Sequence, residues 1–146
     1  MHVHALGHVV LKVQSLERSE RFYTGLLGLR VCARLTEPFP MTFFTLGNHH
    51  DFALMEVGDD AARPAPQTTG LAHVAFKVGD SLEELRAAKN HLRQVGIVIA
   101  YEMDHTVTQS LYLHDPDDNE IELYVDTADT WKTDPLAVAT AELVEF

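Results

Sequence analysis

The feature that most constrains the fold is an internal repeat. Residues 6–13 read LGHVVLKV, and residues 71–78 read LAHVAFKV. Both copies have the apolar alternation of a short strand with a histidine near its start, His8 in the first and His73 in the second. The two histidines are 65 positions apart, and a repeat at that offset within 146 residues indicates two copies of one structural unit.

Composition and charge exclude several functional classes. The formal net charge of −11 argues against a nucleic-acid-binding protein and against binding to anionic membrane surfaces. No apolar run approaches the roughly 18 residues of a membrane span. The start of the sequence lacks the pattern of a signal peptide, and its single cysteine, Cys32, has no partner for an internal disulfide. We therefore expect a cytoplasmic protein.

The order of predicted elements is the same in both halves. In the first half, Ser15 is the expected N-cap of a helix that ends between Gly25 and Gly28. In the second half, Ser81 and Glu84 have the spacing of a capping box, and Gly96 ends the helix that follows. The predicted strands cover 6–13, 29–35, 41–46 and 51–57 in the first half and 71–78, 97–102, 109–114 and 120–125 in the second.

This order predicts an α+β fold with one βαβββ module in each half. We expect a single domain in which a pseudo-twofold relates the modules, so that a curved mixed sheet surrounds a metal cleft. Module one would span about 5–58 and module two about 70–126. A Pro- and Asp-containing linker at about 59–69 would join them, and a tail would follow at 127–146.

Four residues at similar places in the repeat are candidate metal ligands: His8, Glu56, His73 and Glu122. Taken alone, a histidine at the start of a strand is usually a surface residue, and alternation could turn either glutamate toward water. Their recurrence in both halves favours a shared site. Two imidazoles and one carboxylate would leave open positions on Fe(II), whereas four protein ligands would suit a metal acting as a Lewis acid.

The motifs resemble the vicinal oxygen chelate superfamily, which includes glyoxalase I, type I extradiol dioxygenases and metal-free antibiotic-binding proteins. The resemblance covers about residues 5–126 and rests on 7–13 (GHVVLKV), 22–29 (FYTGLLGL) and 115–123 (DPDDNEIEL). It is most like a single-domain extradiol dioxygenase. That resemblance places the metal triad on His8, His73 and Glu122, the acid/base histidine on His50, and further pocket residues on His105 and Tyr112.

The resemblance implies an extradiol enzyme that opens a catechol-like ring with dioxygen and acts as a homodimer or larger homo-oligomer. Fe(II) is the expected metal, with Mn(II), Ni(II) and Zn(II) as alternatives. Glu56 is the main departure, because extradiol enzymes typically have an apolar residue there and glyoxalase I uses a glutamate as its fourth ligand. Two other functions therefore stay open: a glyoxalase I-type lyase or isomerase, and a metal-free small-molecule-binding protein.

Overall fold

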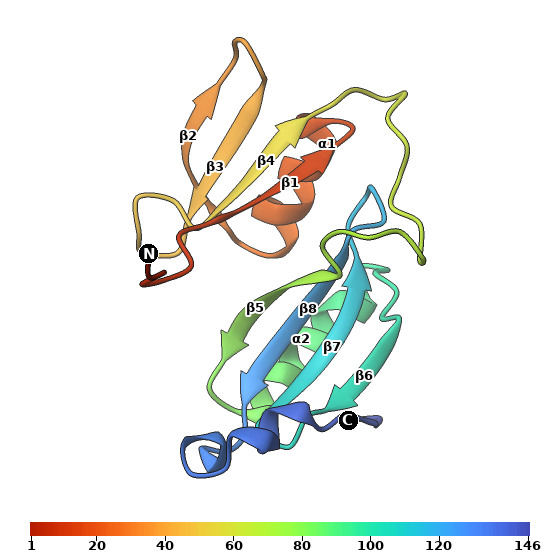
Figure 1. Cartoon of the computed structure of the whole chain (residues 1–146). Helices are drawn as coiled ribbons and strands as arrows, with labels where there is room; N and C mark the ends of the chain where they lie inside the picture. The colour runs from red at the N-terminus through yellow and green to blue at the C-terminus, as the bar shows by residue number, and fades with distance from the viewer. The chain divides into compact units, whose positions relative to one another are not determined.

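The structure is a computed structural model that describes all 146 residues (Figure 1). The chain forms two compact units, Met1–Pro64 and Ala65–Phe146. The boundary falls inside the stretch that the sequence predicts as a linker. No helix of the structure has the length and apolar character needed to cross a bilayer.

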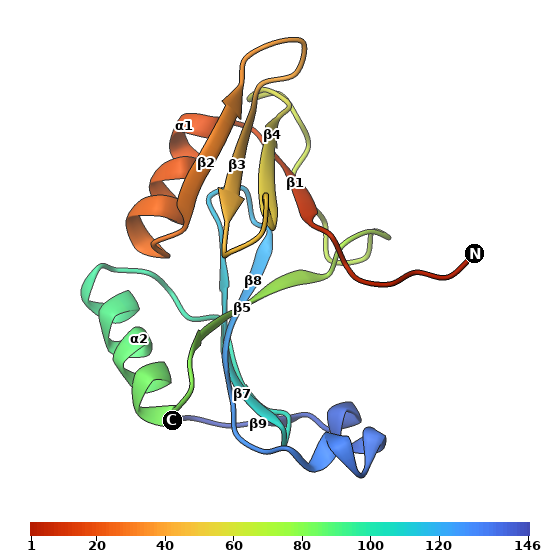
Figure 2. The same ribbon diagram turned by 90° about the vertical axis from the view of Figure 1, so that its left-hand side faces the viewer.

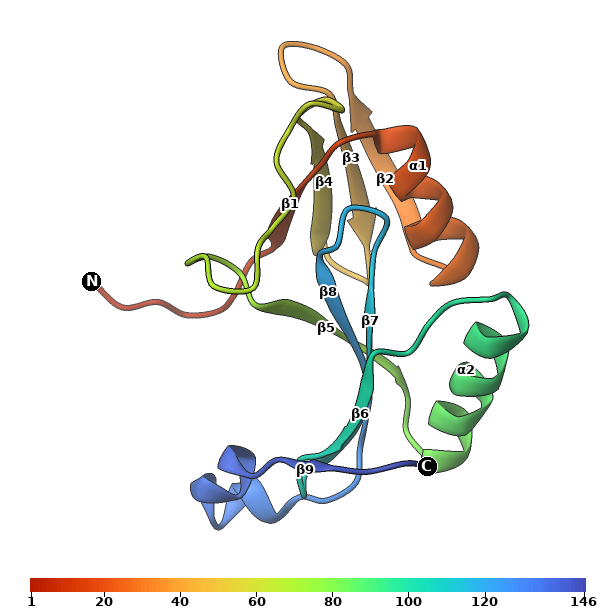
Figure 3. The same cartoon turned by 90° about the vertical axis from the view of Figure 1, so that its right-hand side faces the viewer.

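Unit one contains a four-stranded mixed sheet in the order β1-β4-β3-β2. Strands β1 and β4 are parallel, and the other neighbouring pairs are antiparallel. The helical segment lies along one face of this sheet (Figures 1 and 3). The strands are β1 (Val9–Val13), β2 (Arg30–Leu35), β3 (Met41–Thr45) and β4 (Phe52–Glu56).

The helix of unit one begins as predicted and continues with a wider turn. Ser15 caps α1 (Leu16–Glu20) through its hydroxyl, which accepts a bond from Arg18 N. The chain then continues as the π-helix η1 (Arg21–Leu26). Within it the Thr24 hydroxyl donates a hydrogen bond to the Glu20 carbonyl, 2.5 Å away, and bonds of this kind to the carbonyl four residues earlier often bend a helix.

The core of unit one lies between the helical segment and the sheet. Tyr23 is fully buried and its ring contacts those of Phe44 and Phe52. Leu11 and Val13 of β1 are buried on the same face, whereas Val10 and Lys12, which alternate with them, are exposed. This alternation distinguishes a helix-covered face of the sheet from an open face, and His8 belongs to the open face because it precedes Val10 by two residues.

Unit two repeats the plan and adds a fifth strand from the tail. Its sheet has the order β5-β8-β7-β6-β9, with β5 and β8 parallel. Helix α2 covers one face, and the two short helices of the tail lie on the other side of the sheet (Figures 2 and 3). The elements are β5 (His73–Gly79), α2 (Leu82–Gln94), β6 (Tyr101–Asp104), β7 (Thr108–His114), β8 (Glu120–Asp126), η2 (Thr130–Lys132), η3 (Pro135–Ala139) and β9 (Glu142–Leu143).

The predicted fold class is confirmed, since each unit is a βαβββ module with a curved mixed sheet. Ser81 caps α2, and the carboxylate of Glu84 accepts bonds from the Ser81 hydroxyl and from Asp80 N. The first strand of each module begins later than predicted, at Val9 and at His73, and the largest difference is in β6, which begins at Tyr101 rather than Ile97. The left-handed backbone of Gly96 (φ 78°) and the bond from Ile97 N to Leu92 O hold this stretch at the helix end.

Candidate functional site

In unit two, β5 and β8 bring His73 and Glu122 together on the face of the sheet opposite α2. Ala75, two residues after His73, pairs with Glu122 in the parallel ladder. His73 Nε2 lies 3.0 Å from Glu122 Oε2, and His73 Nδ1 lies 3.8 Å from Glu120 Oε1. The strand register thus places these two predicted ligands next to each other.

The carboxylate of Glu122 is oriented by a neighbouring hydroxyl. Its side chain is only 10% exposed, so an unpartnered charge here would be costly. Ser110 on β7 is fully buried and donates a hydrogen bond to Glu122 Oε1 at 2.6 Å. One carboxylate oxygen is thus held by the protein, and the other faces the imidazole of His73.

This donor pair fits a divalent cation. An imidazole nitrogen and a carboxylate oxygen are ordinary ligands for iron, manganese, nickel and zinc. His73 Nε2 and Glu122 Oε2 lie 3.0 Å apart, so one cation could contact both donor atoms. A hydrogen bond from Ser110 to the other oxygen is the kind of support that metal-binding carboxylates usually have.

Tyr112 and His105 border the same pair. Tyr112 lies directly opposite Glu122 in the β7–β8 ladder, and its ring contacts that of His73 edge-on, with centroids 5.6 Å apart. The ring of Tyr101 stacks on Tyr112 at 4.4 Å. His105, in the turn after β6, has Nε2 at 3.1 Å from the Tyr112 hydroxyl. Four of the residues chosen from the sequence are therefore neighbours in unit two.

Burial and negative charge keep both tyrosines protonated. Burial raises the pKa of Tyr112 well above its usual range, and the nearby carboxylate of Glu122 raises it further. Burial also raises the pKa of Tyr101 to about 12, with a contribution from a hydrogen bond to Glu120. Both hydroxyls are therefore hydrogen-bond donors at neutral pH.

In unit one, His8 lies beside the histidines of the turn before β4. The ring of His8 is 4.2 Å from that of His50, and the His49 and His50 Nδ1 atoms are 2.7 Å apart. The ring of Phe43 closes another side of His50, with centroids 5.3 Å apart. Burial lowers the pKa of His50, and electrostatic repulsion from the neighbouring imidazoles of His8 and His49 lowers it further, with Asp51 opposing. At neutral pH, His50 is therefore a neutral imidazole.

Glu56 is on the other face of the unit-one sheet. It pairs with Val13, whereas the equivalent of Glu122 in this module is Ala53, which pairs with Val10 two residues after His8. The carboxylate of Glu56 accepts a hydrogen bond from Leu16 N, 2.8 Å away, at the start of α1. The expected match between Glu56 and Glu122 therefore needs correction, because the sequence offset between the strands conceals a change of face.

Neither unit by itself gathers three His, Cys, Asp or Glu side chains that could hold a metal ion. His8 belongs to unit one, and His73 and Glu122 belong to unit two. The three-ligand set remains a prediction from the repeat and the family resemblance.

The comparisons with known proteins show the family. The model of the Glyoxalase/Bleomycin resistance protein/Dioxygenase superfamily matches residues 5–123. The chain belongs to this superfamily. Residues 7–13 and 115–123, which suggested the resemblance, lie within the matched range.

Relatives in the superfamily include both a dioxygenase and a lyase. The chain is 35% identical over 130 residues to catechol-2,3-dioxygenase of Bacillus subtilis, and the matched region covers 88% of this chain and 44% of that protein. It is 32% identical over 124 residues to lactoylglutathione lyase of Neisseria meningitidis serogroup A, and the matched region covers 80% of this chain and 87% of that protein. The chain thus spans less than half the length of this dioxygenase.

Solved structures agree with the fold of the superfamily. A glyoxylase/bleomycin resistance protein/dioxygenase domain from Frankia sp. EAN1pec has a TM-score of 0.72 at 21% identity and covers 86% of this chain and all of that one. At this identity the likeness concerns the fold alone.

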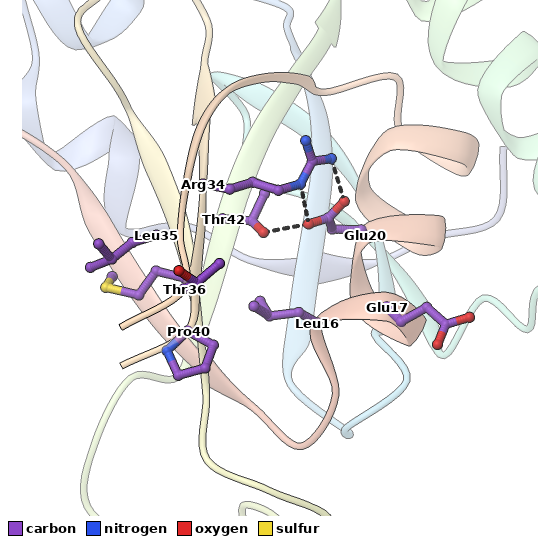
Figure 4. A pocket seen from close by; sticks show the side chains of 9 residues that line it. Leu16, Glu17, Glu20, Arg34, Leu35, Thr36, Pro40 and Thr42 are labelled. Carbon is purple, nitrogen blue, oxygen red and sulfur yellow. Dashed lines mark hydrogen bonds and ion pairs between the residues drawn. The ribbon is translucent and has the colours of Figure 1, made fainter. Parts of the chain in front are cut away.

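Unit one has a hollow on its helix-covered side that the sequence did not predict. It measures about 410 Å³ and lies between α1 and the β2–β3 hairpin (Figure 4). Arg34 forms two hydrogen bonds with Glu20 there, at 2.7 and 3.0 Å, and the Thr42 hydroxyl also bonds Glu20. In the sequence these residues look like ordinary surface positions. None of the site residues of the superfamily resemblance lines this hollow.

Proposed function

We propose that this member of the superfamily is an extradiol-type ring-cleaving dioxygenase acting on a catechol-like aromatic diol. His8, His73 and Glu122 would hold the metal, with Fe(II) expected and Mn(II), Ni(II) or Zn(II) as alternatives. When bound, such a metal supplies Lewis acidity toward the diol oxygens and open positions for the diol and dioxygen. We also retain the expectation of a homodimer or larger homo-oligomer in the cytoplasm.

The observation that carries this proposal is the position of Glu56. A glyoxalase I-type centre would use a fourth protein ligand from the first module. The Glu56 carboxylate instead bonds Leu16 N on the helix-covered face, and Ala53 stands at the place equivalent to Glu122. A set of two histidines and one carboxylate is the arrangement that leaves room for both diol and dioxygen.

His50 is the proposed general base. When His50 Nδ1 donates the hydrogen bond to His49 Nδ1, Nε2 is the nitrogen left to accept a proton from a substrate hydroxyl. A neutral imidazole can accept that proton at physiological pH, and its lowered pKa keeps it neutral. Phe43 packs against the same ring and limits its motion.

Tyr112 and His105 are the proposed orienting residues for the substrate. The Tyr112 hydroxyl stays protonated and borders the His73–Glu122 pair, so its oxygen can accept a hydrogen bond from a diol hydroxyl while its own hydrogen is directed to His105. His105 bonds that hydroxyl and fixes its direction. The stacked ring of Tyr101 holds Tyr112 from its other side.

Anaerobic loading with Fe(II), followed by addition of a panel of catechols in air, tests the proposal. We expect oxygen uptake and a yellow ring-opened product from at least one diol. His50→Ala should abolish this turnover, and His91→Ala, an exposed histidine away from either cluster, should not. A panel without oxygen uptake, despite a full complement of iron, would refute the dioxygenase assignment.

A glyoxalase I-type lyase is the second candidate, because this chain covers 87% of the length of the lactoylglutathione lyase relative. The same purified protein, loaded with Ni(II) or Zn(II), should be assayed with a methylglyoxal–thiol adduct. Turnover of the adduct without catechol cleavage would favour the lyase. If the protein neither contains nor takes up metal, the function left is that of a metal-free small-molecule-binding protein.

A further inference from the structure

The tail segment (residues 127–146) reaches the turn that carries His105. The main-chain oxygen of Thr140 lies 2.8 Å from His105 Nδ1. A carbonyl oxygen only accepts hydrogen bonds, so Nδ1 must carry the proton. In the neutral imidazole, Nε2 then has the free lone pair, and it is Nε2 that faces the Tyr112 hydroxyl at 3.1 Å. The tail therefore selects the tautomer of His105.

The Thr140 hydroxyl holds the same turn from a second direction. It lies 2.8 Å from the His105 carbonyl oxygen and 2.8 Å from Thr106 Oγ1. Thr106 has a left-handed backbone (φ 69°), which is uncommon for a β-branched residue and needs support from its surroundings. Thr140 thus contacts both the backbone and the ring of His105.

A buried ion pair anchors the rest of the tail. Strand β9 pairs with β6, so that Leu143 lies opposite Met103. Beyond β9, Phe146 N donates to Glu102 Oε2 at 2.9 Å, and Lys89 Nζ donates to the main-chain oxygen of Phe146 at 2.5 Å. Lys89 also pairs with Glu102 at 2.7 Å.

The Lys89–Glu102 ion pair is buried, so its remaining hydrogen-bonding groups need partners within the protein. The Lys89 and Glu102 side chains are only 3% and 9% exposed. A buried pair is costly unless its remaining donors and acceptors are satisfied. Phe146 provides both a donor and an acceptor to this pair, so docking the tail lowers that cost.

We propose that Thr140 is a positioning residue of the active site, seated by the Lys89–Glu102 anchor, and that it holds His105 in the Nδ1–H tautomer. The inference rests on the proposed function, which places His105 and Tyr112 at the substrate. With Nε2 free of a proton, His105 accepts the Tyr112 hydroxyl hydrogen and leaves the Tyr112 oxygen with lone pairs toward the substrate hydroxyl. If the tail were released, His105 could adopt the Nε2–H tautomer and turn the Tyr112 hydroxyl around.

The tautomer can be read directly by long-range ¹⁵N–¹H correlation of the metal-free protein, at a pH where His105 is neutral. We expect the Nδ1–H pattern in the wild-type protein. Thr140→Val keeps the main-chain oxygen but removes, at nearly constant volume, the hydroxyl that holds this oxygen against His105. This variant should give a mixture of tautomers, whereas Thr140→Ser should keep the wild-type pattern. Lys89→Met should weaken the anchor and move the His105 signals in the same direction. Thr133→Val, in the tail but away from His105, serves as the control.

Kinetics provide a second readout. Thr140→Val should lower kcat roughly ten-fold while leaving KM and metal content near their wild-type values, as expected for loss of a group that orients a site residue. The inference is overturned if His105 shows the Nε2–H pattern in the wild-type protein, or if Thr140→Val and Lys89→Met both leave its signals unchanged. A tautomer change in a protein that cleaves no diol would refute the proposed function and still support the positioning role.

Discussion

His8 and His73 stand at the same place in the repeat, yet their surroundings differ in chemistry. His73 faces the carboxylate of Glu122 at 3.0 Å, with Glu120 on its other nitrogen. His8 is exposed and has imidazoles as neighbours, with the ring of His50 at 4.2 Å. One module surrounds its histidine with carboxylates, and the other surrounds it with imidazole rings.

The strand register explains the difference. Ala75 pairs with Glu122 in unit two, and the equivalent Val10 pairs with Ala53 in unit one. The backbone plan is therefore shared, but only the second module has a carboxylate on the open face at this position. In the proposed function the two copies of the repeat therefore have different roles: the second provides a ligand carboxylate, and the first provides a proton acceptor.

The largest effects should come from the two histidines that differ most in role. His73→Ala should abolish metal binding and turnover together, because it removes a proposed ligand. His50→Ala should retain the metal and lose turnover by about 10²–10⁴-fold, the usual contribution of a general base. Metal analysis and oxygen uptake on both variants measure this contrast. If both variants kept their activity, neither histidine would belong to the site.

A smaller effect is expected from the hydroxyl that orients Glu122. Ser110→Ala removes the 2.6 Å hydrogen bond to Oε1 and should weaken metal binding by about 10–100-fold. Thr108→Ala, two residues earlier on β7, is the matched control and should bind metal normally. Titration with Mn(II) measures both affinities, and equal values would remove Ser110 from the support of the site.

Glu56 should matter for stability alone. Glu56→Gln keeps an acceptor for Leu16 N but removes the negative charge at the start of α1, which should cost about 0.3–1 kcal/mol of unfolding free energy. Glu17→Gln, exposed in the first turn of the same helix, is the comparison. Denaturant unfolding measures both, and a Glu56→Gln variant as stable as the wild type would contradict this role.

The smallest effect should come from Glu20 and depend on pH. The bonds from Arg34 lower the pKa of this carboxyl below its ordinary 4.5, with Thr42 contributing and burial opposing. A lowered folded-state pKa stabilises the protein above the unfolded-state value, and this stabilisation is lost as pH falls through the folded-state pKa. Glu20→Gln should therefore cost about 0.2–1 kcal/mol near neutral pH, and its difference from wild type should vanish in acid. Urea unfolding at both pH values tests this, and a pH-independent difference would contradict it.

Much of the fold was predictable because its signals are local. Ser15 and Ser81 cap their helices, and Gly96 ends α2 as the sequence indicates. The pairing of Tyr112 with Glu122 follows from their even spacing across a hairpin. Each of these depends on residues close together in the chain.

The rest depends on contacts between distant residues. The face of β4 that carries Glu56 is fixed by its register with β1, which a count along the sequence does not reveal. The tail gave no local signal for β9, because that strand forms by pairing with β6 and docking on Lys89 and Glu102. The wider helical turn after Glu20 likewise has no sequence pattern of its own.

Metal titration of Glu56→Gln and Glu122→Gln, side by side under anaerobic conditions with Fe(II), tests the unequal contribution of the two modules most directly. We predict that Glu56→Gln binds one metal ion per chain with wild-type affinity and that Glu122→Gln binds at least about 100-fold more weakly, as expected for loss of a ligand rather than of an outer partner. Weak binding by Glu56→Gln, with wild-type binding by Glu122→Gln, would contradict the three-ligand site.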